Sequence, residues 1–296
     1  MVSTLSTDRW VKCISTEGNI RGVAIHATDL IQEMVNRHQL KGDSIRGFGE
    51  AVMGALLIAS YCKVGQRINL NVQGSGNYKQ ALIEAFPDGK VRGYLVPREN
   101  PPQFEEGIGP WGTGLLSVLR TKNKEGETPY IGTVPLLTGH LAKDLSFYWV
   151  QSEQIPSAVG LSVEMKGDQV VSAGGFLVQA LPGASVNEVK TIEHHIQELQ
   201  SLAASLKKDS DPLKLLSQIF QSTAFIVVEE KAVEFHCNCS WERVERALAL
   251  VGVDELNSML AENQGAIVRC DFCGKEFQVE KATLERLIVE LSKMPS

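Results

Sequence analysis

The chain reads CNCS at residues 237–240 and CDFCG at residues 270–274, and these two stretches decide how its last part folds. Together they give Cys-x-Cys, a spacer of 30 residues, and Cys-x-x-Cys. Cys-x-x-Cys followed by glycine is typical of a zinc knuckle, because the tight turn directs both sulfurs at one metal and glycine relieves backbone crowding. The late cysteines therefore predict a metal-binding unit.

The spacing of the first pair also requires a turn. Alternate residues of an extended strand are about 6.6 Å apart, which is too far for two sulfurs that share a metal. Two turns that face each other give a tetrahedral thiolate site, and four sulfurs with few competing ligands select zinc. We therefore expect one Zn2+ per chain, bound by Cys237, Cys239, Cys270 and Cys273. The alternatives are a purely structural zinc and four unrelated buried cysteines.

Outward from the cysteines, residues 236–296 are expected to form a small zinc-binding domain, and residues 185–235 a helical linker. One helix is expected over Asn187–Leu206, and Pro212 opens a second helix that runs to Phe220. Both helices are amphipathic, and an amphipathic helix needs a surface for its apolar side. We expect the linker to lie on one or both of its neighbouring domains.

Residues 1–184 predict a core domain of the α+β class. Arg67–Gln73 alternates apolar and polar residues as a half-buried strand does, and Pro87-Asp88-Gly89 marks a hairpin turn. Ser44–Cys62 reads as a long helix that is nearly apolar all round, which indicates burial. Strands joined by short turns fit a mostly antiparallel sheet with helices packed on it.

Composition and charge exclude several classes of protein. The 296 residues carry 29 Lys and Arg against 35 Asp and Glu, and residues 236–296 carry seven against ten. This acidic balance counts against strong binding to nucleic acid or membrane surfaces. No apolar run reaches the ~18 residues of a spanning helix, and the N-terminus is polar, without a signal-peptide core. We expect a cytoplasmic protein whose thiols are kept reduced.

The remaining motifs favour ordinary structural roles. The pattern Gly107-x-Gly109-x-x-Gly112 precedes a strand, so we interpret it as loop glycines and not as a dinucleotide site. Residues 73–76 (QGSG) fit a hairpin turn better than an anion site. His194 and His195 are expected to face solvent, and Cys13 and Cys62 to be small core residues. No nucleophile–base constellation is visible, although separation along the sequence would hide one.

The cysteine pattern, with SEQIPS at 152–157 and AGGFLVQ at 173–179, resembles the thirty-three-kilodalton redox-regulated chaperonin family over essentially the whole chain. The resemblance implies a stress-response chaperone that holds unfolding clients without ATP, binds one zinc when reduced, and dimerises when active. It implies no enzymatic turnover. All four cysteines match the family's pattern.

The physical chemistry of the cysteines supports a switch. Structural zinc contributes an apparent ~10–16 kcal/mol in small peptides, so its loss should melt a small module. Oxidation should convert the thiolates to disulfides, and the natural pairs are neighbours, Cys237–Cys239 and Cys270–Cys273. The linker would then expose apolar side chains, namely Ile192, Leu199, Leu215, Ile219 and Phe220.

The sequence thus predicts a holdase chaperone activated by thiol oxidation, zinc release and disulfide formation. The alternative is a zinc-ribbon protein with a static zinc that binds nucleic acid or a protein partner. A zinc hydrolase or deaminase is disfavoured, because four cysteines leave no coordination position for water and the His-x-Glu signature is absent.

Overall fold

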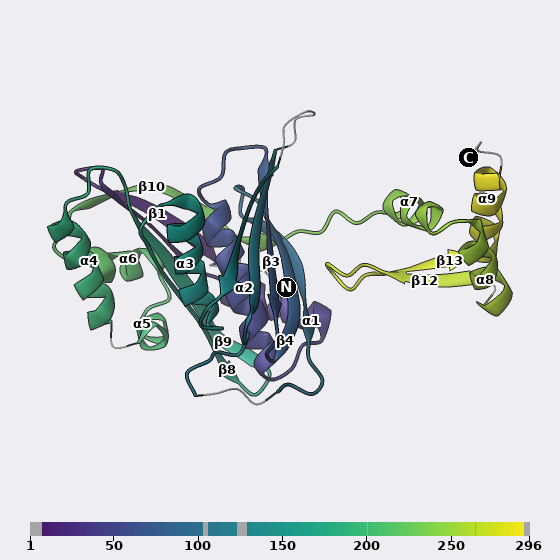
Figure 1. The fold of residues 1–296 in the computed structure, drawn as a ribbon, viewed down its shortest axis with the longest axis horizontal. Coiled ribbons are helices and arrows are strands. Elements are labelled where there is room, and N and C mark those ends of the chain that lie inside the picture. The colour runs from purple at the N-terminus through teal and green to yellow at the C-terminus, as the bar shows by residue number, and fades with distance from the viewer. Residues whose placement is uncertain (1–7, 103–105, 123–128, 200, 264, 293–296) are drawn as a thin grey trace, which may run out of the picture. The chain divides into compact units, whose positions relative to one another are not determined.

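The computed structural model describes residues 8–102, 106–122, 129–199, 201–263 and 265–292. The chain divides into two compact units, Met1–His236 and Cys237–Ser296, and Figure 1 shows their elements. The segment 185–235 belongs to the first unit. The fold is of the α+β class, as the sequence predicts, with mainly antiparallel sheets.

One sheet of the first unit has five strands in the order β10-β1-β2-β9-β8, and all of its pairs are antiparallel. Its strands are β1 (Arg9–Ser15), β2 (Ile20–His26), β8 (Ser157–Lys166), β9 (Gln169–Ala180) and β10 (Phe225–Ala232). Trp10 and Cys13 of β1 are both buried but belong to different apolar clusters. Because side chains alternate along a strand, this sheet is covered on both faces.

The second sheet has six strands in the order β11-β5-β4-β3-β6-β7, and only the short β11–β5 pair is parallel. Its strands are β3 (Gln66–Gly74), β4 (Tyr78–Ala85), β5 (Lys90–Pro97), β6 (Gly114–Lys122), β7 (Tyr130–Leu136) and β11 (Glu234–Phe235). Ile68, Leu70 and Val72 of β3 are buried, as their alternation predicts. Gly89 turns the β4–β5 hairpin at φ +89°, a conformation that favours glycine.

Three helices fill the core, namely α1 (Thr28–His38), α2 (Asp43–Ala59) and α3 (Leu141–Glu153). Helix α2 contacts strands of both sheets, and it is buried on nearly all sides from Ser44 onward. The apolar character of this segment therefore predicted its central position correctly. Within the described residues, no helix is long and apolar enough to cross a membrane.

Three helices of the predicted linker cover the other face of the five-stranded sheet: α4 (Val186–Glu198), α5 (Leu202–Lys208) and α6 (Pro212–Phe220). The prediction of a single helix over Asn187–Leu206 is wrong, because the structure has two helices there. Leu199 is extended, and the hydroxyl of Ser201 accepts a bond from Ala204 N–H and starts a new helix. The second helix has the predicted bounds.

The prediction that the linker is helical to its end is also wrong, because residues 225–232 form strand β10. This strand pairs with β1, more than 200 residues away in sequence. It lies at the edge of the sheet and exposes Ile226, Val227 and Val228, so it lacks the alternation of a half-buried strand.

The second unit contains α7 (Trp241–Val251), α8 (Val253–Asn263), β12 (Gly265–Arg269), β13 (Glu276–Glu280) and α9 (Lys281–Ser292). Strands β12 and β13 form an antiparallel hairpin. The core of this unit is small, and its buried members are Val244, Leu248, Leu256, Phe277, Val279, Leu284 and Leu287. A core of this size gives little stability without a further staple.

Candidate functional site

The four late cysteines converge within the second unit. Their sulfur atoms all lie within 4.8 Å of one another. The Sγ atoms of Cys237 and Cys270 are 3.9 Å apart, and those of Cys239 and Cys273 are 3.5 Å apart. The two motifs therefore meet face to face.

Local backbone geometry explains the position of each pair. Cys270 and Cys273 lie in the turn between β12 and β13, where Gly274 N–H donates to the carbonyl of Cys270 at 2.8 Å. Gly274 has φ +70°, which a glycine adopts without strain. Cys237 and Cys239 precede Ser240, the extended N-cap residue of α7. The start of a helix and the tip of a hairpin thus form the two halves of the cluster.

The cluster has the dimensions of a tetrahedral thiolate site. Zn–S bonds of about 2.3 Å place two sulfurs of a tetrahedron about 3.8 Å apart, close to the two shortest separations here. Cys273 is buried, whereas the other three cysteines are half-buried. The four cysteines can therefore hold a metal ion, and three of them remain within reach of a small reagent in solution.

The electrostatics of the cluster favour a bound cation. Burial raises the pKa of the Cys270 thiol to about 11, and it also raises the pKa of Cys239 and Cys273. Neighbouring sulfurs add to the effect, because a thiolate beside another thiolate is repelled. Four thiolates at neutral pH therefore require a positive charge among them, which a metal ion supplies.

The other residues considered in the sequence take structural positions. Cys13 is buried and Cys62 packs at the edge of the core. The N–H groups of Ser75 and Gly76 donate to the carbonyls of Thr113 and Trp111, so the glycine turn is joined to the loop at 107–113 and offers no anion site there. The interpretation as hairpin and loop glycines is confirmed.

The prediction that both histidines of α4 face solvent is wrong for one of them. His194 is exposed and contacts Glu198. His195 is buried, and its Nδ1 lies 3.0 Å from the carbonyl oxygen of Ile219 near the end of α6. The ring thereby joins α4 to α6, because a terminal helix carbonyl needs a donor from outside the helix.

Two glycines of the five-stranded sheet receive side chains from the linker, which sequence reasoning missed. A Cβ atom on Gly22 would lie 2.9 Å from the ring of Phe220 and 3.3 Å from the sulfur of Cys13. A Cβ atom on Gly174 would lie 2.7 Å from Leu206. The sheet is therefore shaped to receive α6 and α5, and Cys13 lies beneath α6.

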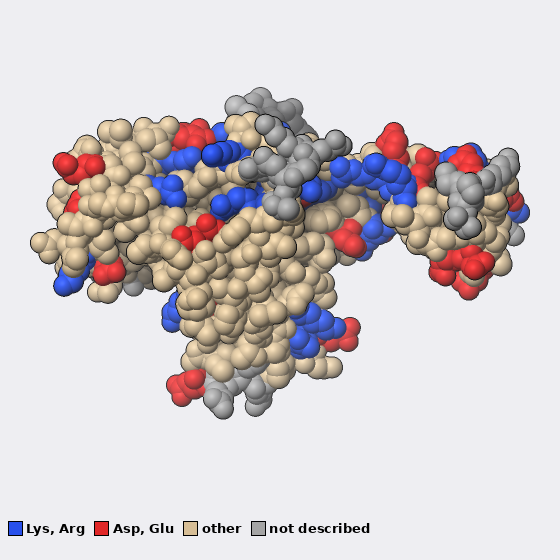
Figure 2. All heavy atoms as spheres, turned by 45° about the horizontal axis from the view of Figure 1, so that its top comes forward, with Lys and Arg blue, Asp and Glu red and all other residues tan. Residues whose placement is uncertain are grey.

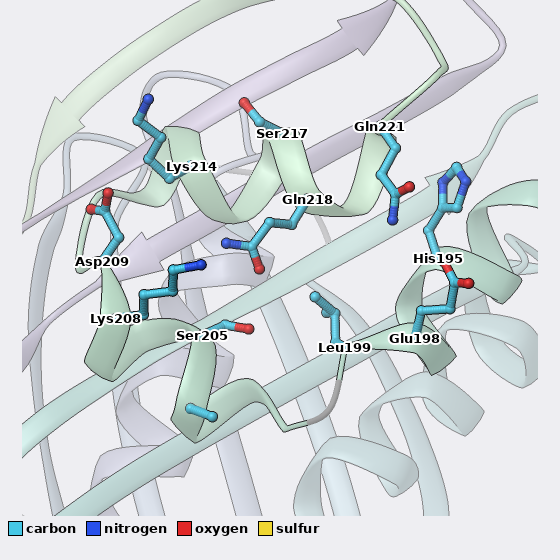
Figure 3. A pocket seen from close by; sticks show the side chains of 11 residues that line it. His195, Glu198, Leu199, Ser205, Lys208, Asp209, Lys214, Ser217, Gln218 and Gln221 are labelled. Atoms are coloured by element: carbon cyan, nitrogen blue, oxygen red, sulfur yellow. The ribbon is translucent and has the colours of Figure 1, made fainter.

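Helix α5 is held less firmly than α6. Its only buried residue is Leu206, whereas α6 buries five residues, among them Ile219 and Phe220. An open hollow of about 810 Å³ lies between the three linker helices. Figure 3 shows the polar side chains of Gln218 and Lys208 directed into it. Sparse apolar contact and a polar hollow mark α5 as a segment that opens at low cost.

Comparison with known proteins identifies this arrangement. The family model described as Hsp33 protein matches residues 8–280. The chain belongs to the Hsp33 family. The Hsp33-family relatives include the 33 kDa chaperonin of Geobacter sulfurreducens, which is 37% identical over 95% of both chains. The 33 kDa chaperonin of Geobacter sp. strain M21 is 34% identical over 98% of this chain and 100% of its own.

A solved structure agrees with the fold of this Hsp33-family chain. The crystal structure of the 33 kDa chaperonin (heat shock protein 33 homolog) from Thermotoga maritima superposes with a TM-score of 0.89 at 28% identity. The match covers 98% of this chain and 100% of the other. The protein is therefore a member of a heat-shock chaperone family, a class that binds client proteins, and it carries a four-cysteine cluster.

Proposed function

We propose that this protein is a redox-regulated, ATP-independent holdase chaperone, inactive with zinc bound and activated by thiol oxidation. The observation that carries the proposal is the convergence of four sulfurs within 4.8 Å in a unit with a small apolar core. A unit with so small a core depends on the four-cysteine cluster for its stability. The cluster consists of thiols, which oxidants attack.

Cys237, Cys239, Cys270 and Cys273 would hold one Zn2+ in the reduced protein. When bound, the ion supplies a positive centre that keeps the four sulfurs deprotonated and together. Its binding adds an apparent ~10–16 kcal/mol in small zinc peptides, against the ~5–15 kcal/mol that stabilises a whole domain. Loss of the ion therefore melts the second unit.

Oxidation would join Cys237 to Cys239 and Cys270 to Cys273. The nearest sulfurs in the folded unit belong to different motifs, so the folded geometry alone allows cross-pairing. Once the unit melts, however, the two cysteines of each motif stay close to each other, while the two motifs separate. Neighbour pairing also closes only tiny loops, which add little stability to the folded state.

Melting of the second unit would release the linker from the five-stranded sheet. The linker presents a continuous apolar side to that sheet, formed by Ile192, Leu206, Leu215, Leu216, Ile219 and Phe220. Both surfaces become exposed when the helices leave, and an exposed apolar area of this kind binds other chains. Holding a client in this way requires no chemical turnover.

The partners follow from the same proposal. Clients are unfolding proteins with exposed apolar segments, the active form is a homodimer as in the family, and the compartment is a reducing cytoplasm. A nucleic-acid partner is disfavoured. Residues 236–296 carry ten Asp and Glu against seven Lys and Arg, and Figure 2 shows acidic side chains interspersed with the basic ones on this unit, whereas a nucleic-acid binder would need a basic surface.

Light scattering of an aggregating client tests the function. The reduced, zinc-loaded protein should leave aggregation unchanged, and peroxide-treated protein should suppress it at near-equimolar ratio. A Cys62→Ser variant controls for oxidation outside the cluster, since it keeps all four cluster cysteines and should respond to peroxide as the wild type does. Equal behaviour of the reduced and oxidised protein would favour the alternative, a static zinc in a partner-binding protein.

A further inference from the structure

Helix α8 joins the two halves of the cysteine cluster. Nearly all of the 30 residues between Cys239 and Cys270 lie in α7, α8 and β12, in that order. Helix α8 is the middle element of the three, and it packs against the other two and against α9. A change that loosens α8 therefore weakens the hold on both cysteine motifs, although α8 itself carries no cysteine.

A short apolar stripe holds α8 in place. Leu256 is fully buried. Met259 and Leu260 follow it at three and four positions along the chain, which places them on the same side of the helix. Both are half-buried and pack against the core of the second unit. Because the stripe is so short, loss of apolar contact at Met259 weakens the packing of the whole helix.

Met259 is also within reach of a small oxidant. Met34 and Met53 are fully buried in the core of the first unit, so solvent does not reach their sulfurs. Met259 is half-buried at the surface of its own unit, and Met165 is half-buried on β8 of the first unit. Met259 therefore combines access from solvent with a position in the packing of the cysteine-bearing unit.

Oxygen transfer to the thioether changes the chemistry of this contact. A peroxide donates one oxygen atom to the sulfur: the S–O bond forms as the O–O bond breaks, the sulfur loses two electrons, and the second oxygen leaves as water. The product, methionine sulfoxide, is a polar side chain. A polar group buried without a hydrogen-bond partner costs free energy, so the oxidised side chain turns away from the core and α8 loses one of its three apolar anchors.

We propose that Met259 is a second oxidation site, whose sulfoxide keeps the cysteine-bearing unit loosened after the cysteines have been reduced again. The two sulfur groups differ in how their oxidation is reversed. Thiol reductants return disulfides to cysteines, whereas methionine sulfoxide is returned to methionine by dedicated reductases. A longer active period of the chaperone rests on the proposed function, but the effect of the sulfoxide on the folding of residues 237–292 does not.

The test takes the full chain through one cycle of oxidation and reduction. Peroxide-treated protein is reduced with dithiothreitol and supplied with Zn2+. Mass mapping of its peptides should find one added oxygen on Met259 and none on Met34 or Met53. Amides of α7 and α8 should still exchange about tenfold faster than in untreated protein, the size expected for a polar group without a partner. Treatment with methionine sulfoxide reductases should remove the difference.

Three variants separate the sulfur of Met259 from its surroundings. Met259→Leu keeps an apolar side chain without sulfur, so its amide exchange should recover fully after the same cycle. Met259→Gln places a polar group there without any oxidant and should exchange faster from the start. Met165→Leu is the matched control, since it removes the half-buried methionine of the first unit and should behave as the wild type does.

The wild-type chain alone decides the proposal even if a variant fails to fold. Met259 that stays unmodified by peroxide, or a Met259 sulfoxide chain whose α7 and α8 amides exchange at the untreated rate, would overturn it. Light scattering of a client on the same samples tests the chaperone function separately. Protein that never suppresses aggregation would contradict that function, and the exchange rates would still decide the role of Met259.

Discussion

The sulfur of Cys239 lies 3.5 Å from the sulfur of Cys273, although 34 positions separate them in the chain. Helix α7 and the β12–β13 hairpin bring them together, with few buried apolar residues to hold the arrangement. The contact between the two sulfurs therefore depends on a metal ion held by the four cysteines.

Reduced protein should contain one zinc per chain, and Cys270→Ser should lower zinc affinity by orders of magnitude. The serine hydroxyl is a much poorer zinc ligand than a thiolate, and three remaining sulfurs leave the site open. Metal analysis after dialysis against a chelator measures this. Cys62→Ser is the matched control and should keep its zinc, since Cys62 lies in the other unit.

Oxidised protein should contain mainly the Cys237–Cys239 and Cys270–Cys273 disulfides. The argument is kinetic, because the partners within a motif remain neighbours after the unit melts. Non-reducing peptide mapping gives the pairs directly. A predominant Cys239–Cys273 bond would instead mean that oxidation captures the folded geometry, and the unit would then stay assembled after activation.

The thiol of Cys13 should report the position of α6. Burial raises its pKa to about 12, so at pH 8 the reduced, docked protein keeps this group protonated and unreactive. Release of α6 removes the burial, the pKa falls toward its ordinary value, and the thiolate fraction at pH 8 rises. Alkylation with iodoacetamide should accordingly be much faster after oxidation. Equal rates before and after would contradict linker release.

The sequence predicted those parts of the fold that local patterns specify. The spacing of the cysteines predicted their convergence, and the apolar run of α2 predicted its burial. Pro212 predicted the start of α6. The apolar run and the proline lie within the helices they predict, and each cysteine pair lies within its own turn, so these signals could be recognised locally.

Features that depend on distant partners were missed. Strand β10 exists because β1 lies beside it, and its own side chains at Ile226–Val228 show no alternation. His195 is polar but buried, because the carbonyl of Ile219 needs a donor. The Nδ1 atom of His26 lies 3.1 Å from Oδ1 of Asp8, a contact that only the tertiary fold brings about. Pairing of this kind is decided by the folded chain and leaves no local signature.

Phe220→Ala should give a reduced protein with partial holdase activity. Phe220 is fully buried and packs over Gly22, and a Phe→Ala change in a core costs about 3–5 kcal/mol. That loss falls on the linker–sheet contact, whereas the zinc cluster is untouched. Client light scattering measures the gain, with Ile226→Ala as control because Ile226 is exposed on the neighbouring strand β10. An inactive, fully folded Phe220→Ala protein would place client binding elsewhere.

Oxidation should loosen the chain from about Asn187 to the C-terminus and leave the core domain folded. The reason is the unequal distribution of stabilisation along the chain. The core places α2 between two sheets in one continuous apolar cluster. The second unit has a small core, and the linker is held by its contact with the five-stranded sheet.

Hydrogen exchange on reduced and peroxide-treated protein separates these regions, because each amide reports the opening free energy of its own segment. Amides of α7 and α8 should lose protection first, because the ion leaves their own unit. Among the linker helices, α5 should open before α6, because α5 buries one residue and α6 buries five. Val52–Ala59 and Ile68–Val72 should stay protected throughout. Uniform loss would mean that the chain unfolds as one cooperative body. Unchanged protection would mean that the cysteine cluster is a static brace, and the switch would then have to be abandoned in favour of a partner-binding zinc protein.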